Sequence, residues 1–343
     1  MLATTTAALL LCVPHLAAAL SLAPAAGTTT TTTRPGHAVV PPRPPPSAQE
    51  QEKGSEVRGL LAMARLKTVP MGALAVGIGA YGARHVEGPG GGLVARLVLG
   101  MALTSIVTAG SMLINDYHDF KRGVDTAETK PGRPLVTGQV RPDTVKLVLK
   151  WAYALHLTLL CFVEPALVRL WVLANTLLTY VYSVHLKPIT GVKNVVCATI
   201  VAMAVGLGAV TRGAGASGGG CEALRAVWRP MAAVAGLIWH REVLMDIKDL
   251  RGDALVGVRT LPVVFGRRRA LLLSLLPLFV GFLAAASCPP LGGARAALAA
   301  SPLLLQGLAA AASGLFADYR GFDAIIEVSP FLLLVSLLAL TSA

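Results

Sequence analysis

The chain has 343 residues, of which 54% are hydrophobic and 14% are charged. Soluble domains carry about a quarter charged residues, so this composition argues against a pair of soluble domains and favours one bundle of membrane helices. The formal net charge of +12 does not indicate nucleic-acid binding, because the basic residues lie mostly in short loops between apolar stretches.

Residues 1–52 differ in composition from the rest of the chain. They contain an apolar, small-residue stretch (Ala7–Leu22), a run of threonines (Thr28–Thr33) and a proline-rich stretch (Pro41–Pro46). No charged residue precedes Arg34. Such a segment cannot build a core, and its composition is typical of a targeting peptide. We expect a disordered transit segment that directs the protein to a plastid or another organelle; a disordered tail without this role is the alternative.

Residues 53–343 read as one membrane domain. Apolar stretches of about 20 residues, the length needed to cross a bilayer, alternate with short polar loops. We expect an all-α, polytopic bundle of about nine transmembrane helices. Basic residues concentrate in the loops on one side of this arrangement, as the positive-inside rule predicts for a correct count. The expected spans are 64–84, 93–114, 143–162, 166–184, 193–211, 229–247, 269–288, 296–317 and 322–341.

The first acidic cluster lies where the second span ends. It contains Asn115, Asp116 and Asp119, followed by Asp125. Asp116 and Asp119 are three residues apart and share a face if the helix continues. Acidic residues at membrane depth are costly and usually functional, although a single Asp-x-x-Asp pair at a helix end is most often a solvated terminus.

The second acidic cluster ends the sixth span. Asp246, Asp249 and Asp253 form one stripe of a helix, and Glu242 extends it by one turn. Like charges at this spacing repel one another, and acids at a helix C-terminus oppose the helix dipole. Both clusters leave the bilayer on the same side, so they can face one cavity. Together they favour Mg²⁺, which bridges a few carboxylates to phosphate oxygens.

Several motifs resemble those of the UbiA superfamily of intramembrane prenyltransferases. The resemblance covers about residues 58–270, and the nine-helix count fits the remainder of the chain. The stretches that carry it are Arg65 with Pro70, Asn115–Asp125, Arg133–Gly138, Tyr182–Pro188 and Asp249–Gly266.

This resemblance implies an enzyme that ionises a prenyl diphosphate with Mg²⁺ and transfers the prenyl group to a lipophilic or aromatic acceptor within the bilayer. It implies catalytic roles for Asp116, Asp119, Asp249 and Asp253. The metal ligands are expected to be Asp116, Asp119, Asp125, Asp246, Asp249 and Asp253. Substrate contacts are expected from Asn115, Arg65, Lys187, Tyr182, Arg133 and Tyr117.

The motifs disagree about the acceptor. The last acid of the first motif stands at Asp125, two residues later than in many members, and Lys121–Thr126 looks like the branch that prenylates dihydroxynaphthoate in quinone biosynthesis. In contrast, Arg241–Val243 and the second motif look like branches that act on geranylgeranylglyceryl phosphate or chlorophyllide. We expect a geranylgeranyl or phytyl donor and a quinone precursor such as dihydroxynaphthoate, with geranylgeranylglyceryl phosphate, chlorophyllide and homogentisate as alternatives.

Other classes of protein also use buried acids. A membrane transporter would more often carry acids near mid-span and show internal repeats, and neither is visible here. A soluble isoprenyl diphosphate synthase would lack the apolar spans. A non-catalytic scaffold of the same family is a further alternative, and the intact acids in both clusters count against it.

Overall fold

A computed structural model describes residues 48–341 with short gaps at 67, 87–90, 188, 215–217, 288–292, 317–318 and 320. These described residues form helices joined by turns and contain no strand, which confirms the all-α class. Most of the expected targeting segment, residues 1–47, lies outside this range.

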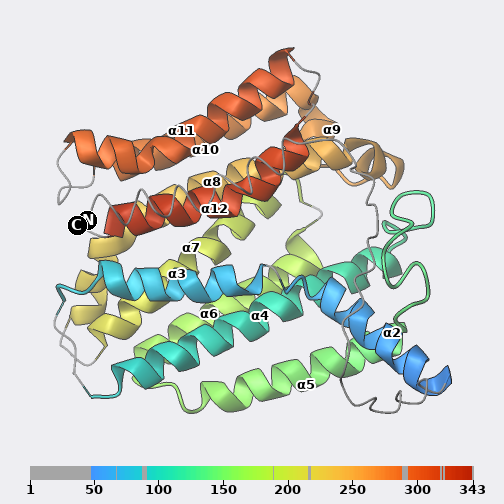
Figure 1. Cartoon of the computed structure of the whole chain (residues 1–343), viewed down its shortest axis with the longest axis horizontal. Coiled ribbons are helices and arrows are strands. Elements are labelled where there is room, and N and C mark those ends of the chain that lie inside the picture. The colour runs from blue at the N-terminus through green and yellow to red at the C-terminus, as the bar shows by residue number, and fades with distance from the viewer. Residues whose placement is uncertain are drawn as a thin grey trace, which may run out of the picture.

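The helices follow one another with short connections (Figure 1). Their bounds are α2 (Ala48–Met63), α3 (Val69–Gly82), α4 (Leu93–Lys121), α5 (Pro142–Leu160), α6 (Ala166–Val181), the π-helix η1 (Tyr182–Leu186), α7 (Val192–Gly213), α8 (Gly219–Leu255), α9 (Leu261–Phe265), α10 (Arg267–Ala286), α11 (Gly293–Phe316) and α12 (Phe322–Thr341).

Each of the nine expected spans coincides with a helix in the described part of the chain. By length and composition, six are able to cross a membrane: α4, α6 with η1, α7, α10, α11 and α12. Helix α3 has only 14 residues, and charged residues interrupt α5 and α8. The chain is therefore an integral membrane protein, and the count of nine spans stays a prediction.

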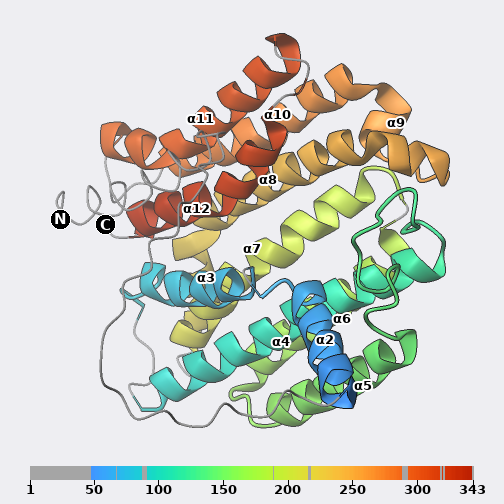
Figure 2. The same ribbon diagram turned by 45° about the vertical axis from the view of Figure 1, so that its right-hand side comes forward.

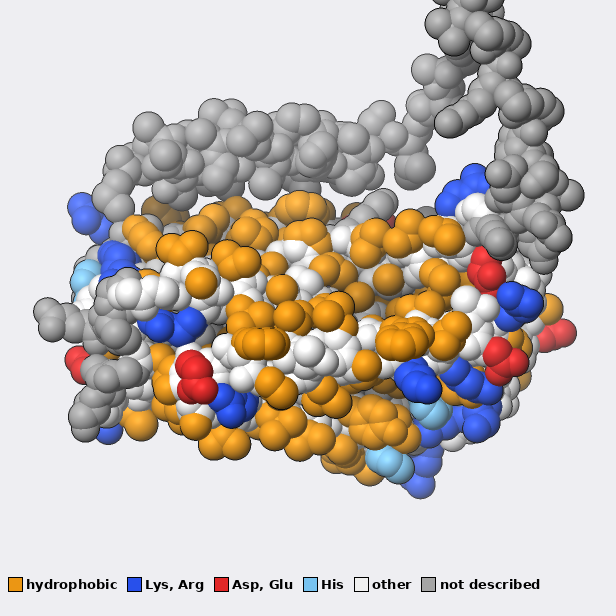
Figure 3. Space-filling model, turned by 90° about the horizontal axis from the view of Figure 1, so that it is seen from below, with side chains coloured by type: hydrophobic (Ala, Val, Ile, Leu, Met, Phe, Trp, Pro, Cys, Tyr) orange, Lys and Arg blue, Asp and Glu red, His pale blue; other side chains and the backbone are white. Residues whose placement is uncertain are grey.

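The helices lie side by side in layers, with α7 and α8 between the α3–α6 half and the α10–α12 half (Figures 1 and 2). A continuous apolar core joins them and includes Val76, Val205 and Leu237. Many large apolar side chains face outward, among them Leu276 and Leu308. Figure 3 shows hydrophobic side chains covering the middle of the molecule and charged ones gathered toward its two ends. This distribution fits a bilayer around the middle of the bundle.

Two glycines bring the backbones of α3 and α7 into direct contact. A Cβ atom on Gly79 would lie 1.9 Å from the carbonyl oxygen of Val205, and one on Gly208 would lie 1.8 Å from that of Val76. Small residues allow this close approach in membrane bundles, where packing rather than water exclusion holds helices together. The contact sets the position of α3. This helix contributes Met71, Gly72, Ala75 and Ile78 to the wall of the cavity described below.

Replacing Gly79 or Gly208 by Ala should destabilise the bundle by about 1–3 kcal/mol, the usual cost of overpacking. The new methyl group meets backbone atoms that can move only with their helix. Thermal unfolding in detergent measures the loss. Gly54→Ala is the matched control, because a Cβ at Gly54 has no neighbour within 4 Å; equal midpoints for all three variants would contradict the prediction.

Candidate active site

The first acidic cluster is built by the end of α4 and the turn that follows it. Asp116 and Asp119 belong to the helix, whereas Asp125 lies beyond Gly123, which has a φ of +69°. This conformation favours glycine and lets the chain fold back, so that the Asp125 amide donates a hydrogen bond to the Asp119 carbonyl at 3.2 Å. The turn brings the third acid of the motif to the cavity described below.

Two arginines hold Asp116, whose side chain is only 4% exposed. The guanidinium of Arg65 lies 3.3 Å from one carboxylate oxygen, and that of Arg133 lies 3.1 Å from the other. Arg65 adopts a φ of +49° in the turn between α2 and α3. The Thr68 hydroxyl donates a hydrogen bond of 2.9 Å to the Arg65 carbonyl in the same turn. A non-glycine residue in this conformation is strained, and such strain tends to occur at functional sites.

Lysines from neighbouring segments contact the other acids. Lys187, directly after η1, lies 2.5 Å from Asp119. Lys130, in the loop after the first motif, lies 2.7 Å from Asp249 on α8. Because Arg133 in this same loop contacts Asp116, the loop connects the two acidic clusters, which therefore lie at the same end of the bundle.

Asp246 is the most enclosed acid of the second cluster. It forms an ion pair with Lys193 and accepts a hydrogen bond from the Asn194 side chain at 3.4 Å. Both partners lie in the first turn of α7. Asp249 and Asp253 lie nearer the C-terminal end of α8 and extend the stripe toward the loops.

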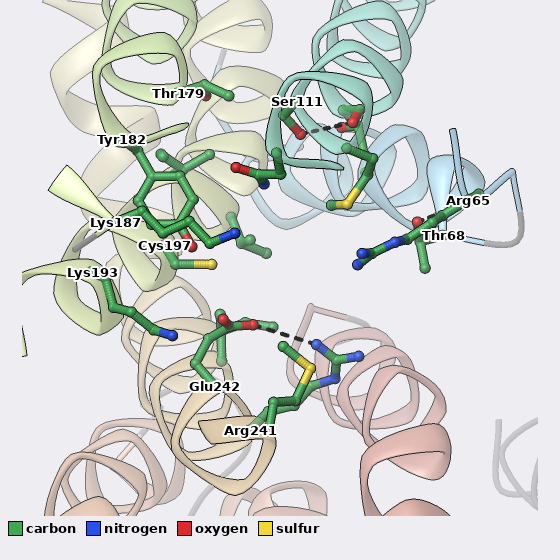
Figure 4. A pocket seen from close by; sticks show the side chains of 18 of the residues that line it. Arg65, Thr68, Ser111, Thr179, Tyr182, Lys187, Lys193, Cys197, Arg241 and Glu242 are labelled. Carbon is green, nitrogen blue, oxygen red and sulfur yellow. Dashed lines mark hydrogen bonds and ion pairs between the residues drawn. The ribbon is translucent and has the colours of Figure 1, made fainter. Parts of the chain in front are cut away.

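A cavity of about 1050 Å³ joins the two clusters and continues between the helices. Its charged end is lined by both clusters, and its inner walls are largely apolar, including Leu103, Trp171, Leu207 and Leu337. Figure 4 shows Tyr182 and Lys187 projecting into this space from one wall and Arg65 from another. This volume is near the upper end of the range of about 300–1,000 Å³ for small-molecule pockets, and the shape suits a molecule with a charged head and a long apolar tail.

The cavity contains most of the residues predicted from the sequence. Those that line it are Arg65, Asn115, Asp119, Asp125, Arg133, Tyr182, Lys187, Asp246, Asp249 and Asp253. Asp116 lies behind Arg133, beside a small separate pocket. Tyr117 packs with the cluster around Met63, and His118 packs edge-on against it at 5.4 Å. Neither ring lines the cavity.

Several lining residues received no role in the sequence analysis. They are Arg122, Lys130, Lys193, Arg241, Glu242, Lys248 and Arg259. Lys130 carried a usable signal, since it lies between the first motif and Arg133 in a loop already expected to face the site. Glu242 was seen only as an extension of the second acidic cluster, and for the other basic residues a positive charge near a helix end is equally typical of a membrane anchor.

The carboxylates of the two acidic clusters suit a metal ion that is bound jointly by the protein and by a substrate. Among the described residues, no three acids, histidines or cysteines group tightly enough to form a metal site by themselves. The available donors are carboxylate oxygens, and the buried amide oxygen of Asn115 has no hydrogen-bond partner. Oxygen donors of this kind suit Mg²⁺, which usually keeps waters and shares ligands with phosphates.

At the charged end of the cavity, burial and a neighbouring cation have opposite effects on Asp125. Burial raises the pKa of the Asp125 carboxyl, and the Arg133 guanidinium at 3.6 Å offsets part of the rise. A cation beside Asp125 would stabilise its ionised form further.

An all-α membrane bundle with paired acidic clusters, basic side chains around them and an apolar cavity behind them has the features of an intramembrane enzyme. The chain belongs to the UbiA prenyltransferase family, whose model matches residues 71–337. It is therefore a prenyltransferase, and this class is favoured over the transporter and scaffold alternatives.

Relatives with known names point to one branch of the family. The chain is 31% identical over 216 residues to the digeranylgeranylglyceryl phosphate synthase of Methanopyrus kandleri, covering 63% of this chain and 72% of the relative. It is 33% identical over 243 residues to the synthase of the same name from Halobacterium salinarum, covering 69% and 79%. These archaeal relatives give no support to the expected quinone pathway or plastid location.

Solved structures share the fold. A UbiA homologue from Aeropyrum pernix K1 superposes with a TM-score of 0.64 at 17% identity, covering 78% of this chain and 95% of that one. A UbiA homologue from Archaeoglobus fulgidus, bound to DMAPP and Mg²⁺, gives a TM-score of 0.59 at 19% identity, covering 83% and 99%.

Replacing Arg133 by Met should destabilise the protein by about 2–3 kcal/mol, because it removes a hydrogen-bonded counter-charge from the buried Asp116. The double variant Asp116→Asn with Arg133→Met should recover part of this loss, since the buried residue 116 then carries no charge that needs a partner; the rest of the loss stays, because Asp125 still lacks Arg133. Thermal unfolding in detergent measures both. Arg58→Met, on the exposed side of α2, should change stability by less than about 0.5 kcal/mol; a double variant no more stable than the single one would contradict the assignment.

Proposed function

We propose that the protein transfers a geranylgeranyl group from geranylgeranyl diphosphate to the free hydroxyl of geranylgeranylglyceryl phosphate in a Mg²⁺-dependent reaction. The product would be digeranylgeranylglyceryl phosphate, the compound named in the relatives. The observation that carries the prenyl-transfer chemistry is the meeting of two acidic clusters, with basic partners, at the charged end of an apolar cavity. The Mg²⁺ requirement is further supported by the metal-bound homologue from Archaeoglobus fulgidus.

Four acids are placed to hold the metal in this proposal: Asp119 and Asp125 from the first cluster, and Asp249 and Asp253 from the second. Bound Mg²⁺ would act as a Lewis acid that neutralises the diphosphate leaving group. Asp116 and Asp246 were also expected as ligands. Both are almost completely buried, and arginines hold the first and Lys193 the second, so we assign them the role of fixing these cations around the substrate.

Basic side chains would contact the diphosphate directly. Arg65 and Arg133 offer planar forks that match phosphate oxygens, and Lys187 offers a point charge. All three line the cavity beside the first cluster. The contacts they make with Asp116 and Asp119 hold them in place before the substrate arrives, which lowers the cost of ordering them on binding.

The apolar part of the cavity would take the prenyl tail. Its walls exclude water, which protects an allylic cation from hydrolysis. Tyr182 is buried at the boundary between the charged and apolar parts. Its ring face is suitably placed to stabilise positive charge on the reacting carbon.

The acceptor is the part of the sequence prediction that we revise. The relatives favour geranylgeranylglyceryl phosphate, which the sequence analysis held as an alternative, over dihydroxynaphthoate. The cavity also supports this choice, because Arg241, Lys248 and Arg259 line it in addition to the basic residues assigned to the diphosphate. A phosphorylated acceptor needs such further positive charge, whereas a neutral aromatic ring system does not.

Replacing Asp119 or Asp249 by Asn should reduce pyrophosphate release at least about a hundredfold, because several kcal/mol of leaving-group stabilisation depend on the metal. Purified protein with Mg²⁺, geranylgeranyl diphosphate and acceptor provides the assay, and chelation of Mg²⁺ should have the same effect on the unmodified enzyme. Asp143→Asn makes the same chemical change at a side chain that is 91% exposed on α5 and should leave turnover unchanged. Normal turnover in both site variants would refute the metal assignment.

An acceptor panel tests the specificity. With geranylgeranyl diphosphate as donor, geranylgeranylglyceryl phosphate should give an ether product at a kcat/KM at least tenfold above that for dihydroxynaphthoate, homogentisate or chlorophyllide. The reason is the surplus of basic residues that line the cavity. Mass spectrometry of the extracted lipids identifies the product, and phytyl diphosphate serves as the comparison donor. A preference for dihydroxynaphthoate would restore the quinone assignment.

A further inference from the structure

One cavity-lining acid has no part in the mechanism above. Glu242 lies on α8, its residue is 8% exposed, and its side chain borders the cavity. Among the described residues, its one hydrogen-bond partner is Arg241, at the long distance of 3.5 Å. Figure 4 shows the Glu242 carboxylate projecting into the space between Arg241 and Lys193. Its carboxyl group is therefore directed at the substrate volume and has only a weak hydrogen bond to the protein.

Glu242 lies deeper in the cavity than the proposed metal ligands on α8. Seven residues of α helix separate Glu242 from Asp249, which is about 10 Å along the axis. The stripe runs from Asp253 at the loop end inward through Asp249 and Asp246 to Glu242. A diphosphate held at the level of Asp249, with its prenyl tail in the apolar part of the cavity, would have its first prenyl carbon on the inner side of the phosphates, toward Glu242.

The basic side chains around Glu242 are shared with other partners. Lys193 pairs with Asp246, and Arg241 shares its guanidinium with the Ile326 carbonyl of α12 at 3.4 Å. Two basic side chains, Lys193 and Arg241, thus lie beside the two acids Asp246 and Glu242, and each of them also contacts a group other than Glu242. The titratable or charged groups that face Glu242 are Lys193 and Cys197 from α7, Tyr182 and Lys187 from the η1 segment, and Arg241 and Asp246 from α8.

We propose that Glu242 is the general base that accepts the proton of the acceptor hydroxyl. The bond between the first prenyl carbon and the diphosphate oxygen breaks, and its electron pair leaves with pyrophosphate. The hydroxyl oxygen of the acceptor forms the new ether bond to that carbon, and its proton passes to the Glu242 carboxylate. This inference rests on the proposed function, because a hydroxyl acceptor has a proton to lose at this point.

The test separates ionisation of the donor from capture by the acceptor. Glu242→Gln should lower kcat for ether formation about a hundredfold, the scale of general-base catalysis, while the KM for geranylgeranyl diphosphate and the Mg²⁺ requirement change less than threefold. The ionised donor is then captured by water, so the ratio of geranylgeraniol to ether product should rise. Ether formation by the unmodified enzyme should fall at low pH as Glu242 becomes protonated, and this acid limb should vanish in the variant. Glu242→Asp should restore part of the rate.

Glu222→Gln is the matched control, since it removes an exposed carboxylate from the first turn of the same helix. It should retain normal rates, and binding of geranylgeranyl diphosphate to Glu242→Gln should confirm that the variant is folded. Ether formation by Glu242→Gln at the normal rate overturns the base assignment and leaves the proposed function intact. Absence of ether product from the unmodified enzyme overturns the proposed function and the base together.

Discussion

The structure depends on balancing acidic charge at the edge of a bilayer. Asp116 and Asp246 are almost completely buried, and a carboxylate in such a place is stable only when cations accompany it. Arginines accompany the first and a lysine the second. The acids nearer the cavity are paired too, through Lys187 and Lys130. The charged end is thus an alternating arrangement of both signs, into which a metal and a diphosphate could enter as a matched pair.

This balance also organises the chain around the cavity. The partners come from positions far apart in the sequence: Arg65 before α3, Lys130 and Arg133 in one loop, and Lys187 beside η1. An ion pair made by each of these four residues attaches a connecting segment to α4 or α8. The helices supply the apolar chamber, and the charges position the loops over its mouth. Arg65 lies in the turn directly before α3. Close packing of α3 against α7 at Gly79 and Gly208 therefore also helps to position Arg65.

The sequence predicted the helices and the acids well, for clear physical reasons. Apolar stretches of bilayer length are easily recognised in a sequence, and the nine expected ranges coincide with helices in the described part of the chain. Acids are rare at membrane depth, so two clusters stood out. Pairing was not predictable, because the Lys130–Asp249 contact depends on how a long loop folds. Tyr117 lies two positions from each of the cavity-lining residues Asn115 and Asp119, and two residues turn about 200° around a helix, which directs its ring away from the cavity.

The contact between Lys130 and Asp249 has a consequence for observing the enzyme at work. A divalent ion and the lysine compete for the same carboxylate, so we expect the loop that carries Lys130 to release α8 when the proposed metal–diphosphate pair binds. A change in the position of this loop would then indicate that the cavity is occupied. A spectroscopic label on that loop could follow each turnover without any probe entering the membrane.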